Sequence, residues 1–142
     1  MRAFLFLGFF VAILSSCITT SQPKLDFKTT AEAEAYLKKH NACPGCNLYR
    51  AELSYADLRG ADLRGANLRG GDLTKADLRG ANLKGAVLIR ADLSTGTKLQ
   101  GADLSEVDMT GANIEPAELN LANTCGAVYP SGDHALPCEN KK

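Results

Sequence analysis

Hydrophobic positions recur with a period of five through the middle of the chain. Residues 56–78 read ADLRGADLRGANLRGGDLTKADL, with a leucine at every fifth position. On an α-helix five residues advance by about 500°, so these leucines would be spread over every side of the helix. On a continuous strand an odd spacing would place successive leucines on opposite faces. The period therefore predicts a chain that bends once in each repeat and keeps every leucine on its inner side.

Each repeat combines a short extended segment with a corner. Alanine usually stands two residues before the leucine, and residues two apart point the same way in an extended segment. Dipeptides such as Arg-Gly and Lys-Gly follow, and glycine tolerates the backbone angles of a tight turn. One extra residue falls between Ser94 and Thr97 and shifts the register by one. The sixteen predicted central residues are Leu48, Leu53, Leu58, Leu63, Leu68, Leu73, Leu78, Leu83, Leu88, Leu93, Leu99, Leu104, Met109, Ile114, Leu119 and Thr124.

This pattern resembles the signature of the pentapeptide-repeat family, A-(D/N)-L-x-x, over residues 46–126. The resemblance implies an all-β fold, a right-handed quadrilateral β-helix with four repeats in each coil. Sixteen repeats would form about four coils, and central residues twenty apart would stack, Leu48 over Leu68 over Leu88. Repeats of this kind bury their apolar side only against neighbouring repeats, so both ends of the solenoid need a cap.

A short α-helix is predicted before the first repeat, over residues 29–40. Thr29 and Glu32 fit a capping box at its start, and Ala and Leu favour the helix. One apolar face, which includes Leu37, needs a surface to cover. We therefore expect residues 29–45, the helix and the CPGC turn, to cap the first coil.

The N-terminus reads as an export signal. Residues 1–16 combine a basic start with an apolar run that is too short to span a membrane, which needs about 20 residues. The sequence LSSC, ending at Cys17, resembles the lipobox of bacterial lipoproteins, in which the cysteine carries diacylglycerol and an N-acyl chain. An ordinary signal peptide with a chance cysteine is the alternative. The lipobox implies a mature protein that starts at Cys17, with residues 17–28 as a tether to the membrane. In lipoproteins of enteric type, Ile18 after the cysteine resembles sorting to the outer membrane.

Four further cysteines stand at the ends of the repeats. Extending the period backward places Cys43 and Cys46 inside, so a disulfide between them or two buried thiols is expected rather than a redox site. No second pair of zinc ligands is nearby in the sequence. Cys125 and Cys138 flank a turn-rich segment in the tail, residues 127–142, and an oxidising compartment permits their pairing. We predict the disulfides Cys43–Cys46 and Cys125–Cys138. A CPGC before the first repeat is also similar to what many members of the family show.

Charge is balanced overall and uneven along the chain. The sixteen basic and sixteen acidic residues cancel. Residues 50–90 carry eight basic and five acidic residues, whereas residues 91–122 carry six acidic residues and Lys98 alone as a base. The repeats should therefore be basic near the first coils and acidic near the last.

Coils of four repeats would stack the basic residues on adjacent faces. Arg59 falls on Arg79, and Arg64 falls on Lys84, while Tyr49 also points outward. One interpretation is a contact surface for an anionic partner, such as lipid headgroups, a polyanionic glycan or an acidic protein patch. The alternative is a solvated face whose Arg and Asp neighbours form weak pairs of about 0–1 kcal/mol.

No catalytic residues, cofactor or metal are indicated. The chain has no G-x-S-x-G and no phosphate-binding Gly-Lys loop, and no histidine lies among the repeats. Some members of the family imitate DNA and engage gyrase, but the basic repeats and the export signal argue against nucleic-acid-related roles. The sequence predicts a non-enzymatic, lipid-anchored envelope protein that binds a protein or an anionic polymer. The alternatives are a passive structural component or a small-ligand binder that uses Tyr49.

Overall fold

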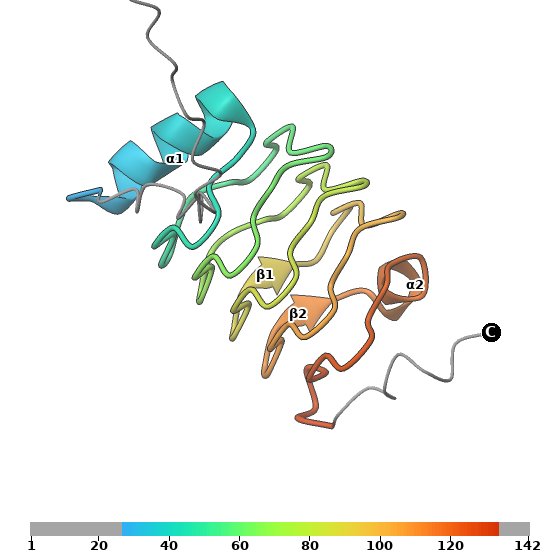
Figure 1. Ribbon diagram of the computed structural model, residues 1–142. Coiled ribbons are helices and arrows are strands. Elements are labelled where there is room, and N and C mark those ends of the chain that lie inside the picture. Colours follow the sequence, from blue (N-terminus) through green and yellow to red (C-terminus); the bar gives the residue numbers. More distant parts are fainter. Residues whose placement is uncertain (1–26, 134–142) are drawn as a thin grey trace, which may run out of the picture.

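The computed structural model describes residues 27–133, which wind into a stack of coils with a helix at one end (Figure 1). The helices are α1, Thr30–His40, and α2, Pro116–Leu119, and the strands are β1, Asp92–Leu93, and β2, Asn113–Ile114. Strands β1 and β2 pair in parallel, with Asp92 opposite Asn113. The other rungs of the ladder are single parallel bridges.

The spacing of these bridges measures the coil. Asn47 bridges Asn67, and Asn67 bridges Val87, so one turn of the solenoid takes twenty residues. Because each repeat has five residues, four repeats complete one turn. The predicted stacking of Leu48, Leu68 and Leu88 agrees with this register.

The extra residue is absorbed at one corner. Across it the spacing becomes twenty-one residues, as in the bridge from Asp77 to Lys98. Thr95 and Gly96 both take positive φ, 48° and 84°, and Thr97 turns inward, with 1% of its surface exposed. The Thr97 hydroxyl donates to the Leu73 carbonyl at 2.8 Å, which holds the widened corner against the coil beneath. The core continues past the insertion without a break.

The regular corners all use the same turn. The amide of Ala51 donates to the Leu48 carbonyl at 3.0 Å, which closes a four-residue turn. The third residue of each turn takes the left-handed conformation, whether it is Gly60 (φ 65°) or Arg50 (φ 55°). Non-glycine residues therefore occupy this corner at some cost in strain.

The Asp or Asn that precedes most central residues fixes the entry to that turn. Its side-chain oxygen accepts the amide two residues later, as Asp72 does from Thr74 at 2.9 Å and Asn67 from Arg69 at 3.2 Å. This local hydrogen bond is the kind that favours Asx residues at turns. It explains why both acids and amides serve at this position.

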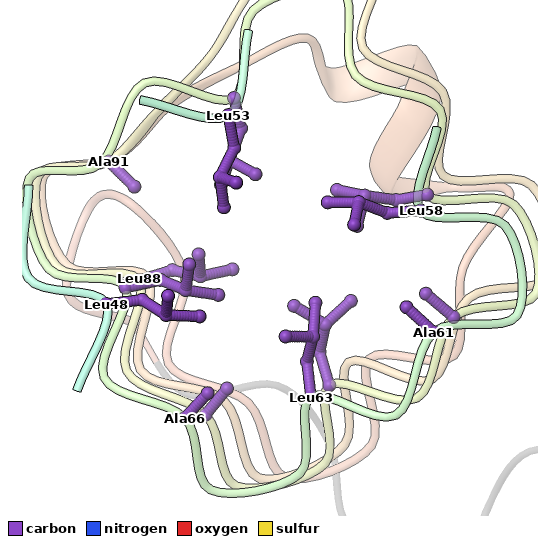
Figure 2. Packing of buried hydrophobic residues seen from close by; sticks show 14 of the residues in the cluster. Leu48, Leu53, Leu58, Ala61, Leu63, Ala66, Leu88 and Ala91 are labelled. Atoms are coloured by element: carbon purple, nitrogen blue, oxygen red, sulfur yellow. The ribbon is translucent and has the colours of Figure 1, made fainter. Parts of the chain in front are cut away.

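The core is a narrow column of aliphatic side chains. Leu48, Leu53, Leu58 and Leu63 point inward from the four sides of the coil, with alanines between them (Figure 2). These leucines are fully buried. Leu and Ala side chains fill most of the inside, with Val107 and Met109 among the few other apolar residues there, so the chain has a core without tryptophan.

Helix α1 lies over the first coil and buries Ala33 and Leu37 in the same core. Thr29 accepts the Glu32 amide at 3.2 Å, as a capping box requires. The Glu32 carboxylate accepts the amide of Lys28 instead of that of Thr29, so the reciprocal bond is shifted by one residue.

Polar groups of this helical segment also bond to the open edge of the first coil. Asn41 Nδ2 donates to the Arg59 carbonyl at 2.8 Å, and the Glu52 amide donates to Glu34 Oε1 at 3.0 Å. The first rung has no coil above it, so its backbone groups would otherwise lack protein partners. Four such bonds form, with Asn41, Glu34, Thr30 and Lys38.

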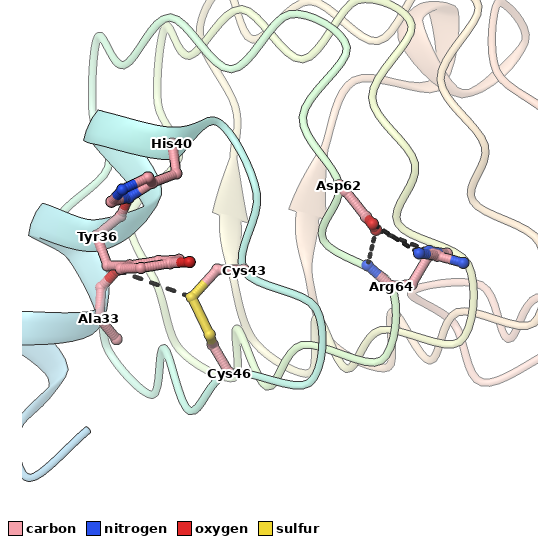
Figure 3. Close-up of a disulfide and its surroundings, with 7 residues drawn as sticks. All are labelled: Ala33, Tyr36, His40, Cys43, Cys46, Asp62 and Arg64. Atoms are coloured by element: carbon pink, nitrogen blue, oxygen red, sulfur yellow. Dashed lines mark hydrogen bonds and ion pairs between the residues drawn. A yellow bond between two sulfur atoms is a disulfide. The ribbon is translucent and has the colours of Figure 1, made fainter. Parts of the chain in front are cut away.

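Cys43 and Cys46 form a disulfide at the base of α1, with their Cα atoms 5.4 Å apart (Figure 3). Both are buried and belong to the core cluster. Cys43 Sγ lies 3.9 Å from the Ala33 carbonyl oxygen. A disulfide sulfur has no hydrogen to donate, so this is a packing contact between the turn and the helix.

The prediction of a regular repeat around Leu119 is wrong, because helix α2 occupies this part of the chain. Pro116 stands where the corner needs a positive φ, and the proline ring holds φ near −65°. The chain instead forms one helical turn with Pro116 at its start. The Glu118 carboxylate then accepts the Leu99 amide at 3.0 Å, in place of a backbone acceptor. The ladder resumes at Asn123, which bridges Asp103.

The ladder also runs one repeat further than predicted. Val128 bridges Asp108, which places Tyr129 over Met109 as a further central residue. The phenol of Tyr129 lies 3.2 Å from the hydroxyl of Thr124. These two polar side chains close the inside of the coil at its C-terminal end.

Candidate functional site

The five residues of the predicted binding surface lie on three faces of the β-helix. Arg59 and Arg79 share one face, because Asp57 bridges Asp77 beside them, and Arg64 and Lys84 share the next, where Asp62 bridges Asn82. Tyr49 lies on a third face, beside the bridge from Asn47 to Asn67. All five side chains are exposed or partly exposed.

Three of the predicted arginines are held in ion pairs within their own repeats. Asp62 and Arg64 flank the inward Leu63, so both point outward. Arg64 Nε donates to Asp62 Oδ1 at 2.8 Å, and Nη2 donates to Oδ2 at 2.7 Å (Figure 3). The two parallel bonds match the fork of the guanidinium to the carboxylate. The same geometry recurs in the pairs Asp57–Arg59 and Asp77–Arg79.

These pairs lower the pKa values of their carboxyl groups. Hydrogen bonds from the Arg79 side chain lower the pKa of Asp77 to about 2. Those from Arg59 and Arg64 likewise lower the pKa of Asp57 and Asp62. The carboxylates therefore stay charged at neutral pH and balance the arginines beside them.

Lys84 is also paired. Its Nζ lies 3.2 Å from Glu106 Oε1, a residue of the next coil. The four cations predicted to attract an anionic partner therefore each have a carboxylate close by, as the alternative interpretation of weak surface pairs expects.

Arginines that the sequence analysis did not single out lack such partners. Among residues 27–133, Arg50, Arg69 and Arg90 form no ion pair. The guanidinium of Arg50 lies over the ring of Tyr49, 5.3 Å from its centroid. The sequence indicates that Arg69 is unpaired, because Asn67 stands where an aspartate would have paired with it.

A hollow lies at the C-terminal end of the coils. It has a volume of about 760 Å³ and is lined by residues of α2 and of the last coil, including Ile114, Leu119 and Tyr129. Its walls are mainly apolar. The missing regular repeat at α2 opens this space.

The predicted pairing of Cys125 with Cys138 is not made in this structure, where Cys125 has a free thiol. Its backbone is held in the last coil, because its amide donates to Asn123 Oδ1 and its carbonyl accepts the Glu106 amide. The side chain is buried, with 7% of its surface exposed. Cys138, like the predicted lipid site Cys17, lies outside the described residues.

Two classes of feature are absent from the described part of the chain. No group of three or more His, Cys, Asp or Glu side chains among residues 27–133 could hold a metal ion. Within the same residues, neither helix has the length and apolar character needed to cross a membrane.

The family model described as Pentapeptide repeats matches this chain in eight copies, over residues 42–70, 72–94 and 95–123. No protein of curated function matches the chain.

Solved structures with similar chains include alr5209, a pentapeptide repeat protein from Nostoc Pcc 7120. The two are 39% identical over 70% of this chain and 74% of alr5209, with a TM-score of 0.49. HetL, a pentapeptide repeat protein involved in heterocyst differentiation regulation in the same cyanobacterium, is 31% identical over 66% of this chain and 51% of its own, with a TM-score of 0.36. A pentapeptide repeat protein from the thylakoid lumen of Arabidopsis thaliana is 25% identical over 70% of this chain and 68% of its own, with a TM-score of 0.35.

Proposed function

Because this chain belongs to the pentapeptide-repeat family, a family of right-handed β-helices that act as structural and interaction modules, we propose that it is a non-enzymatic binding or scaffold module of the cell envelope. A lipid on Cys17 anchors it to the membrane, and this is the outer membrane if the cell is Gram-negative. Its partner is a protein or an anionic polymer.

The observation that supports a binding role is the fixed placement of the outward side chains. The backbone of an inner rung is bonded to the coils on both sides, as at Asp77, whose amide donates to Ala56 while the Leu78 amide donates to Lys98. A surface that is already ordered loses little conformational entropy on binding. The β-helix is therefore suited to present side chains rather than to close around a substrate.

The anchoring proposal rests on the sequence before the described residues. The sequence LSSC follows a short apolar run, as in a lipobox. Two or more acyl chains give stable anchoring, whereas a single chain is marginal. The tether between Cys17 and α1 would reach on the order of 40 Å if fully extended, which holds the β-helix near the membrane surface.

Anchoring is tested by expressing the full chain in a bacterium supplied with labelled palmitate. We expect label and membrane fractionation for the wild type and neither for Cys17→Ser. Cys125→Ser is the matched control and should keep both. Label that persists in Cys17→Ser would overturn the lipid assignment without affecting the fold.

Binding is tested by crosslinking intact cells and purifying the tagged chain from membranes. The predicted surface is changed in one variant, with Arg59, Arg64, Arg79 and Lys84 all replaced by Gln. A partner that is enriched by the wild type and lost from this variant supports a contact through that surface. A wild type that enriches nothing beyond an unrelated lipoprotein of equal abundance supports the passive structural role instead.

A further inference from the structure

Three arginine side chains without ion-pair partners gather around one small hollow on the Tyr49 face. The hollow has a volume of about 300 Å³ and is lined by Tyr49, Arg50, Arg69, Gly70 and Arg90. We call it the arginine notch. These residues come from three successive coils, since residues twenty apart are stacked.

The hollow exists because a glycine stands between two arginines in one column of corners. Arg50, Gly70 and Arg90 occupy equivalent corner positions, and all have φ between 55° and 65°. A Cβ on Gly70 would lie 3.4 Å from Cγ of Arg50. The stem of Arg50 therefore lies over the space that a side chain at position 70 would fill.

Over the three coils that line the notch, this face carries no aspartate at the position that pairs with an arginine elsewhere, which explains why Arg69 is unpaired. On two other faces Asp62 and Asp77 hold the arginine two residues later. Here the equivalent positions are Asn47, Asn67 and Val87. Asn67 Oδ1 accepts only the backbone amide of Arg69, at 3.2 Å, and the guanidinium stays available. Within residues 27–133, no carboxylate lies within 4.0 Å of the three guanidinium groups.

We propose that the arginine notch binds a phosphate group. Each guanidinium offers donors in a fixed fork that suits phosphate oxygens. A tetrahedral dianion can accept from several guanidiniums in different directions, whereas a planar carboxylate has only two oxygens to offer. The Tyr49 ring holds the Arg50 guanidinium at 5.3 Å from its centroid, which positions one wall of the notch. A volume of about 300 Å³ lies at the lower end of the range of ligand pockets and admits the group with its water.

This inference goes beyond the proposed function and does not depend on the anchor or on the paired arginines. The phosphate could belong to a soluble phosphorylated compound or to a lipid headgroup. The chemistry of recognition is the same, so the two sources are separated by the probe.

The test uses the full chain purified with Cys17→Ser, so that no lipid is attached. Sodium phosphate is titrated at constant ionic strength against chloride, and the Arg Nε–H and backbone amide signals are followed by NMR. In a second arm, the protein is sedimented with phosphatidylcholine vesicles with and without phosphatidic acid. We expect saturable, phosphate-specific shifts confined to residues 49–50, 69–70 and 90.

Two variants and a matched control decide the outcome. Arg69→Gln should weaken binding by about tenfold, the effect of losing one charge-assisted hydrogen bond. Gly70→Asn should fold, because other corners carry non-glycine residues at the same φ, and should block the notch. Lys98→Gln, which removes an exposed cation on another face, beside the bridge from Asp77, should bind as the wild type does.

Binding to inorganic phosphate with this pattern supports a soluble source. Binding to phosphatidic acid vesicles alone, with the same pattern, supports a lipid headgroup. Absence of binding in both arms would overturn the proposal, and so would an equal loss in Arg69→Gln and Lys98→Gln or the same shifts with chloride. None of these outcomes alters the membrane label or the crosslinking result that test the proposed function.

Discussion

Truncating one central leucine should remove a large part of the stability of the whole domain. Leu78 is fully buried, with Leu58 and Leu99 stacked on either side of it in the preceding and following coils. Leu78→Ala removes the outer part of the side chain and leaves a cavity inside a closed tube. Leu→Ala changes in cores cost about 2–5 kcal/mol, and the cost rises when the cavity cannot collapse.

The walls around Leu78 cannot move inward easily. The Asp77 amide donates to Ala56 at 2.9 Å, and the Leu78 amide donates to Lys98 at 2.9 Å, so both neighbouring coils hold this rung in place. Closing the cavity would require breaking these bonds. We therefore expect a loss of about 4 kcal/mol, near the upper end of the range. Leu78→Asp should prevent folding, because it would place an unpaired charge in the same space.

The measurement is urea unfolding of the full chain followed by far-ultraviolet circular dichroism, with the free energy of unfolding extrapolated to water. Leu121→Ala is the matched control, since Leu121 keeps 51% of its surface exposed and should lose no more than about 0.5 kcal/mol. A loss below about 1.5 kcal/mol at Leu78, or one equal to that at Leu121, would contradict a dry and rigid interior.

Three further predictions concern the ion pairs, the insertion and the disulfide. The pKa of Asp77 is about 2 in the folded protein and 3.8 ordinarily, so its pair with Arg79 adds stability above pH 4 that is lost as the pH falls towards 2. The difference in urea midpoint between the wild type and Asp77→Asn should therefore shrink over that range. A difference that stays constant with pH would contradict the pairing. Thr97→Val should cost about 1 kcal/mol through loss of the bond to Leu73, measured in the same unfolding assay, and no change would show that this bond does not stabilise the corner. Reducing the Cys43–Cys46 disulfide should cost about 2 kcal/mol, as judged by the shift in urea midpoint with dithiothreitol, and the double Ser variant should not respond to the reductant.

The period of five was enough to predict the coil from sequence. It excludes a helix and a straight strand on geometry alone, and the observed bridges from Asn47 to Asn67 and from Asn67 to Val87 have the spacing that the family resemblance implied. Stacking could be predicted because every repeat contributes the same inward leucine. The local turn preference of each repeat and the burial of its leucine in the stacked coils therefore favour the same structure.

The failure at Leu119 has a physical cause that the sequence also contained. Counting apolar residues every five positions finds Leu119 but ignores the corner three residues before it. That corner requires a positive φ, and Pro116 cannot adopt one. Tyr129 was missed because an aromatic residue does not match the repeat signature, although its position fits over the last coil. Apolar spacing alone is therefore less informative than spacing combined with the backbone angle that each corner demands.

The same distinction decides which cations are available to a ligand. Sequence reasoning grouped the arginines by position and left open whether they form a free contact surface or weak pairs with neighbouring aspartates. For an arginine that directly follows a central leucine, the residue two positions earlier determines the outcome, since Asp62 engages Arg64 with both oxygens and Asn67 leaves Arg69 unpaired. Asp and Asn are equivalent for the turn, because either accepts the backbone amide. They differ in the charge that they offer to the arginine side chain, and Asn adds an amide donor, as from Asn67 Nδ2 to Asn47 Oδ1. The use of Asp or Asn at this position therefore leaves the fold unchanged but decides whether a face carries ion pairs or arginines available to a ligand. The arginine notch accordingly lies on the face with Asn47 and Asn67.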